Sequence, residues 1–168
     1  MRPWEHLKAR GPCVAAALAM PGEGKTSILI EAMLSGAWPH VACVDPEFEL
    51  HLPGRNIQYL KPDRDDWRKI PQGSLVVLDE LDGICKDVQG GYEWCLHIFR
   101  ACRPWGITVL WSAQTPYEVP RGATRRCRLL FLGQILEERD LEYLRTYYPK
   151  APETLPNLAP HRFLVIRR

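Results

Sequence analysis

The sequence predicts a three-layer α/β fold with a mostly parallel central sheet. Short apolar segments of strand length alternate along the chain with segments of helical composition. A glycine-rich turn at residues 19–26 follows the first apolar segment, and paired acids follow a later one. With 168 residues and 46% hydrophobic residues, the chain is long enough for one core, so we expect a single domain over residues 1–168.

The first strand is expected over residues 13–18 and the first helix over residues 27–34, and the turn between them has the composition of a phosphate-binding loop. It matches the pattern G-x-x-x-x-G-K-[ST] except that Ala19 replaces the first glycine. Lys25 would reach the β- and γ-phosphates of a nucleotide, and the Thr26 hydroxyl would bind Mg²⁺. The predicted nucleotide-binding residues are Pro21, Gly22, Glu23, Gly24, Lys25, Thr26 and Ser27.

Two more strands and a short helix are expected before the acids. Residues 40–46 form an apolar run that Pro46 ends, and residues 56–60 form a shorter one. Residues 65–69 have the composition of a short capped helix.

Paired carboxylates close the next strand, expected over residues 74–80. Four apolar residues precede Asp79 and Glu80, as in a buried parallel strand that carries acids at its C-terminal end. Asp79 would bind Mg²⁺ together with Thr26, and Glu80 would orient or deprotonate the water that attacks the γ-phosphate. A solvated acidic turn is the alternative.

A helix over residues 92–103 leads to a strand over residues 106–112, which we expect between the first strand and the acid-bearing one. Gln114 follows it and would contact the γ-phosphate or the attacking water, the alternative being a turn residue before Pro116. Further strands are expected over residues 128–132 and 162–166.

Composition excludes several classes of protein. No apolar stretch reaches the ~20 residues that span a bilayer, and the chain begins unlike a signal peptide, so we expect a cytoplasmic protein. The six cysteines form no C-x-x-C pair, which argues for buried thiols rather than zinc or redox chemistry. A net charge of +2 is too small to indicate nucleic acid, although residues 121–128 hold a basic cluster.

With these motifs in order, the chain resembles the HerA/FtsK superfamily of DNA-pumping ATPases, especially the compact genome-packaging ATPases of tailless membrane-containing viruses. The arginine-containing stretch 100–106, the acidic helix at 138–144 and the closing segment 156–165 also resemble the family. The resemblance implies a RecA-like (ASCE) P-loop NTPase fold that binds ATP and Mg²⁺ in a pentameric or hexameric ring. Arg103, with Arg100 as second choice, would be the arginine finger that enters a neighbour's site; a surface ion pair is the alternative.

The same resemblance implies that the ring moves double-stranded DNA into a preformed capsid, in the host cytoplasm or at a packaging vertex with a portal or membrane partner. Residues 86–92 and 121–128 are candidate DNA contacts, the alternative being a solvated strand edge. Other readings are a filamentous-phage-type morphogenesis ATPase, a nucleotide-dependent assembly switch with little hydrolysis, a small-molecule kinase and a helicase.

Overall fold

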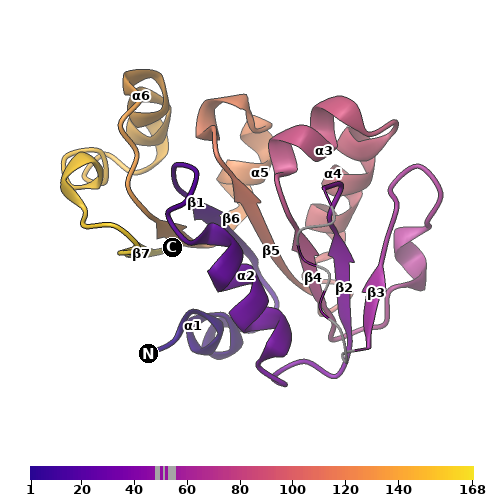
Figure 1. The fold of residues 1–168 in the computed structure, drawn as a ribbon. Helices are drawn as coiled ribbons and strands as arrows, with labels where there is room; N and C mark the ends of the chain where they lie inside the picture. Colours follow the sequence, from indigo (N-terminus) through magenta and orange to yellow (C-terminus); the bar gives the residue numbers. More distant parts are fainter. Residues whose placement is uncertain (48–49, 51, 53–55) are drawn as a thin grey trace.

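A seven-stranded sheet forms the centre of the computed structural model, which describes residues 1–47, 50, 52 and 56–168 (Figure 1). The strand order is β3-β2-β4-β5-β1-β6-β7. The strands are β1 (Val14–Leu18), β2 (Val41–Val44), β3 (Ile57–Tyr59), β4 (Leu75–Leu78), β5 (Thr108–Ala113), β6 (Cys127–Leu132) and β7 (Leu164–Arg167).

Every neighbouring pair of strands is parallel except β6 and β7, which are antiparallel. Strand β5 lies between β1 and β4, as the sequence predicts. Leu18 pairs with Ala113 and Leu78 with Trp111, so the chain leaves β1, β4 and β5 at one edge of the sheet. In open parallel sheets this edge, outside the carboxyl ends of the strands, is where ligands bind.

Helices cover both faces of the sheet, which gives the three predicted layers (Figure 1). The helices are α1 (Pro3–Arg10), α2 (Lys25–Leu34), α3 (Leu81–Asp87), α4 (Gly91–Ala101), α5 (Arg121–Arg126) and α6 (Glu138–Tyr147). Helices α1 and α2 pack on one face, and α3 to α6 contribute to the core on the other. Strands β1, β4 and β5 are buried along their whole length, as expected for parallel strands covered on both sides. No helix in the described ranges has the length and apolar character needed to cross a membrane.

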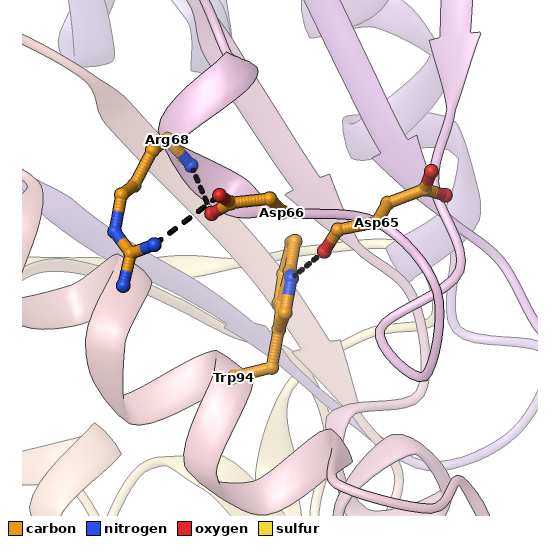
Figure 2. Close-up of polar contacts among 4 residues, drawn as sticks. All are labelled: Asp65, Asp66, Arg68 and Trp94. Carbon is orange, nitrogen blue, oxygen red and sulfur yellow. Dashed lines mark hydrogen bonds and ion pairs between the residues drawn. The ribbon is translucent and has the colours of Figure 1, made fainter.

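Some elements differ from the sequence prediction. The short helix expected at 65–69 is only a single 3₁₀ turn at Trp67–Lys69, capped by Asp66, whose carboxylate accepts a hydrogen bond from the Arg68 backbone amide at 3.0 Å (Figure 2). The Trp94 indole N–H on α4 donates to the Asp65 carbonyl at 2.8 Å and fixes this turn against the helix. Helices α1, α3 and α5 were not expected, because each is too short for its apolar period to stand out.

Candidate active site

The loop between β1 and α2 has the backbone of a phosphate cradle. Gly22 and Gly24 have φ angles of +78° and +90°, in the left-handed region that glycine enters without the cost of a Cβ. Gly24 is the N-cap residue, so the helix begins at Lys25 rather than at the predicted Ser27. The unpaired amides of this first turn and the positive end of the helix dipole favour an anion here.

Lys25 is the buried cation of this loop. Its side chain is 5% exposed, and its Nζ donates to the carbonyl oxygens of Ala19 and Met20 at 3.0 and 3.1 Å. Burial lowers the pKa of the Lys25 amine, and the nearby carboxylates of Glu80 and Asp79 oppose that shift. The amine is therefore held by the backbone of the loop, within electrostatic reach of the acids that follow β4.

Asp79 is buried at the end of β4 and is oriented by a residue that the sequence did not single out. The Ser112 hydroxyl on β5 donates to Asp79 Oδ1 and accepts a hydrogen bond from the Glu80 backbone amide at 2.9 Å. Ser112 is fully buried. The available signal was a serine near the end of a largely apolar central strand, because a buried hydroxyl needs a hydrogen-bond partner.

Glu80 and Gln114, predicted from separate segments, lie side by side. The Gln114 Nε2 amide donates to Glu80 Oε1 at 3.0 Å. Glu80 has φ +50° and ψ +63°, a left-handed conformation that is strained for a residue with a side chain. Burial raises the pKa of the half-buried Glu80 carboxyl, which makes it a stronger base than a solvated glutamate.

Asp82, in the first turn of α3, is a second acid that sequence reasoning missed. Its Oδ1 is buried, with no hydrogen-bond partner within the described ranges, and burial raises the pKa of its carboxyl. Its charge acts on both Lys25 and Glu80. Asp82 therefore adds negative potential beside the predicted base.

The segment that precedes β7 packs against the phosphate loop, a contact that joins distant parts of the sequence. The backbone amide of His161 donates to Glu23 Oε2 at 3.0 Å. A Cβ at Gly24 would lie 3.4 Å from the His161 ring and 3.8 Å from Phe163. A Cβ at Gly133, the residue after β6, would lie 2.6 Å from the Ala19 Cβ. The loop is therefore closely supported on this side.

The oxygen donors present suit Mg²⁺ bound together with nucleotide phosphates. Asp79 offers a buried carboxylate, and Thr26 offers a half-buried hydroxyl in the first turn of α2. The described residues contain no cluster of three acidic, histidine or cysteine ligands. Two hard ligands without a complete protein cage are typical of a magnesium ion that shares its coordination with phosphates and water.

The structure does not bring the predicted finger residues to this edge. Arg100 lies in the last turn of α4 and Arg103 just after it, where the chain enters β5. Five residues of β1 separate the entry edge from the loop, a distance of about 13 Å at the rise of a parallel strand. Neither arginine therefore lies beside the phosphate loop of its own chain.

The two candidate DNA-contact segments are partly helical. In the first, Lys86 lies on α3 and forms an ion pair with Glu118, and Tyr92, on α4, is 43% exposed. In the second, residues 121–126 form α5 and residues 127–128 begin β6. The first segment therefore consists of the end of α3, a short turn at residues 88–90 and the start of α4, and the second consists of α5 and the start of β6.

No protein-family model and no curated protein matches the sequence, but solved structures do. The genome packaging NTPase B204 of Sulfolobus turreted icosahedral virus 2, solved with AMP, matches with a TM-score of 0.70 at 14% identity over 99% of this chain and 94% of that one. EssC (ATPases 2 and 3) from Geobacillus thermodenitrificans matches with a TM-score of 0.72 at 13% identity, over 93% of this chain and 38% of that one. The pCW3 conjugation coupling protein TcpA matches with a TM-score of 0.68 at 15% identity, over 94% and 58%.

These likenesses confirm the predicted fold. The proteins that share this fold are described as a genome packaging NTPase, a protein with several ATPase units and a conjugation coupling protein. B204 has also been solved with ATP-γS and with AMPPCP.

Proposed function

We propose that this chain is the motor subunit of a ring-forming ATPase that translocates double-stranded DNA, most specifically a viral genome into a preformed capsid. One observation carries the hydrolase part. Asp79, Ser112, Glu80 and Gln114 form a connected hydrogen-bond network beside Lys25 of the phosphate loop. The packaging part is supported by the fold shared with B204, whose structures are described as those of a genome packaging NTPase.

In the proposed reaction, the loop amides and Lys25 bind the triphosphate, and Glu80 accepts a proton from the attacking water. Gln114 holds the Glu80 carboxylate and orients that water. Asp79 and Thr26 would hold Mg²⁺, which supplies charge neutralisation at the β- and γ-phosphates. The raised pKa of Glu80 supports its role, because a stronger base accepts the proton more readily.

Arg103 completes the site from a second copy in this proposal. It is exposed, no ion pair in the described ranges includes it, and it lies at the edge opposite its own loop. A guanidinium at the γ-phosphate stabilises the charge of the transition state. Repeated head-to-tail contact of this kind closes into a ring when the rotation allows it.

The proposed partners are duplex DNA in the pore and a capsid vertex, portal or membrane protein at which the ring is anchored in the host cytoplasm. Basic residues of segments 86–92 and 121–128 would follow phosphates without reading base sequence.

The decisive experiment is ATP hydrolysis at high protein concentration, with and without duplex DNA, for the wild type and three variants. Glu80→Gln, Lys25→Ala and Arg103→Ala are each expected to lose turnover. An equimolar mixture of Glu80→Gln and Arg103→Ala should recover activity, because the first supplies Arg103 to the intact site of the second. A mixture of Glu80→Gln and Lys25→Ala is the control and should stay inactive, since each has a defective site of its own.

The other outcomes separate the alternatives. Nucleotide binding without turnover under any condition would overturn the motor and favour an assembly switch. DNA-stimulated turnover with strand separation would indicate a helicase, and phosphoryl transfer to a small molecule would indicate a kinase.

A further inference from the structure

A basic hollow of about 650 Å³ lies at the sheet edge opposite the phosphate loop. Its floor consists of buried side chains from the entry of β1, β5 and β6 and from the last turn of α4, and its rim is rich in arginine. The floor residues are Cys13, Val14, Phe99, Cys102 and Cys127. The rim arginines are Arg100, Arg103, Arg125, Arg126, Arg128 and Arg168.

Within the part of the chain that the structure describes, these six guanidinium groups form no ion pair with an acid. They are all exposed. Arg168 lies over the Tyr148 ring, 5.1 Å from its centroid, which orients one cation without neutralising it. Because these positive charges surround one concave surface, their potentials add and the hollow is strongly positive.

The positive charge of Arg103 also acts on the buried thiols of the floor. Burial raises the pKa of Cys13 to about 11 and that of Cys102 to about 12, and the positive charge of Arg103 opposes both shifts. A buried, largely apolar floor lowers the local dielectric, so an anion seated on it interacts more strongly with the rim than it would in water.

Helix ends explain only part of this cluster. Arg100 lies in the last turn of α4, and Arg125 and Arg126 lie in the last turn of α5, where cations are favoured. Arg103, Arg128 and Arg168 lie outside both helices. The arginines thus come from α4, the connection to β5, α5, β6 and the residue after β7. Favourable charge at helix ends therefore does not account for the whole cluster.

We propose that the hollow is an oligophosphate-binding site, separate from the phosphate loop of the same chain. Its volume lies in the range of small-molecule sites, and several planar guanidinium forks suit a chain of phosphate groups. Free nucleotide is one source of this chemistry. Nucleotide bound on the loop of a second copy is the other, and only that source rests on the proposed ring. In that case Arg125, Arg126, Arg128 and Arg168 join Arg103 around the neighbour's triphosphate.

The test uses inorganic tripolyphosphate titrated calorimetrically into the full chain carrying Lys25→Ala, which disables the loop. We expect one site per chain. Adding Arg125→Ala with Arg128→Ala should weaken binding roughly tenfold for each guanidinium removed, because a charge-assisted hydrogen bond contributes about one power of ten in affinity. Arg125→Lys with Arg128→Lys should lose less. The control is Arg145→Ala, an exposed arginine in the last turn of α6, which should bind as the parent does.

A competition experiment decides whether the phosphate groups that the hollow binds belong to free nucleotide or to nucleotide on a second copy. The competing copy is Glu80→Gln with its own hollow disabled by Arg125→Ala and Arg128→Ala. If this copy, loaded with ATP, displaces tripolyphosphate at concentrations where ATP alone does not, the neighbour's nucleotide is the source. If ATP alone competes equally well, free nucleotide is the source.

Two results would overturn the proposal. One is the absence of tripolyphosphate binding, whether or not duplex DNA binds to the arginines, and the other is tripolyphosphate binding that the arginine substitutions leave unchanged. Failure of the ATPase proposal is distinguishable, because these titrations do not require hydrolysis. A protein that binds tripolyphosphate in the hollow but never hydrolyses ATP would retain this site and lose the proposed function.

Discussion

Glu80 combines a strained backbone with a carboxyl group whose raised pKa is caused by burial. The folded protein therefore holds this proton more tightly than the unfolded chain does. The resulting stabilisation is present below the ordinary pKa of glutamate, about 4.3, and is lost as the pH rises through the raised folded-state pKa. Above that value, the ionised Glu80 destabilises the fold.

We therefore expect Glu80→Gln to unfold at a higher temperature than the wild type at pH 7 to 8, with the difference disappearing at about pH 4. Thermal denaturation across this pH range measures it. The same substitution at Glu142, exposed on α6, controls for the loss of one negative charge. A variant no more stable than the wild type at neutral pH would contradict the burial argument.

Ser112 is expected to matter for magnesium as well as for stability. Ser112→Ala removes a donor to Asp79 and an acceptor for the Glu80 amide, at an estimated cost of about 1–3 kcal/mol of unfolding free energy. Turnover or apparent Mg²⁺ affinity should fall about 10–100-fold, because groups that orient metal ligands contribute on this scale. Denaturant unfolding and hydrolysis at varied Mg²⁺ concentration measure the two effects.

Ser74→Ala is the matched control for that variant. Ser74 is also fully buried, and its hydroxyl donates to the Pro71 carbonyl at the opposite end of the sheet. It should lose stability but keep its turnover and Mg²⁺ dependence. Equal behaviour of the two variants would mean that Ser112 is only a structural residue.

At the residue scale, the sequence indicated the functional side chains that directly follow a strand. It missed the residues whose role depends on a contact with a residue far away in the sequence. Asp79, Glu80 and Gln114 each follow an apolar run, so parallel topology alone places them at one edge. Ser112 acts across two strands, and His161 meets Glu23 from 138 positions away along the chain. Local patterns hold no signal for such pairs.

At the scale of elements, the junction of β1, the loop and α2 requires a residue in the left-handed conformation at Gly24. Gly24→Ala should cost about 1–2 kcal/mol, because φ +90° is strained for a residue with a Cβ, and it should also weaken nucleotide binding, because relief of that strain would move the backbone of the phosphate loop. Calorimetric titration with a nonhydrolysable ATP analogue and thermal unfolding measure the two effects.

Gly36→Ala separates strain from function. Gly36 has φ +71° just beyond α2, and a Cβ there would have nothing within 4 Å. It should lose stability by a similar amount and bind the analogue normally. If Gly24→Ala binds nucleotide as tightly as Gly36→Ala does, the loop is not the phosphate cradle.

The elements were predictable where burial dominates. Strands β1, β4, β5 and β6 are apolar runs, and the structure has them within two residues of the expected bounds. The six-residue helix α5 buries only Ala123 and Thr124, and its other residues are three arginines and one glycine, so its sequence indicated a basic surface instead. The antiparallel pairing of β7 with β6 is tertiary information that an apolar run cannot convey.

The whole molecule has two charged edges that face away from each other. The phosphate loop and its acids lie where the parallel strands end, and Arg103 lies where they begin. A site that needs both edges cannot close within one chain. The proposed function therefore makes hydrolysis a property of assembly, while nucleotide binding by the loop remains a property of the single chain.

Dilution tests this division directly. Turnover per subunit should fall as the wild type is diluted below its association range, because each site then loses the arginine of its neighbour. The affinity of the loop for a nonhydrolysable analogue should change far less, since the residues from Gly22 to Thr26 come from one chain. Arg103→Ala should show low turnover at every concentration. Turnover per subunit that stays constant down to concentrations at which sedimentation shows only monomer would mean that one chain hydrolyses ATP unaided, and the head-to-tail site would then be wrong.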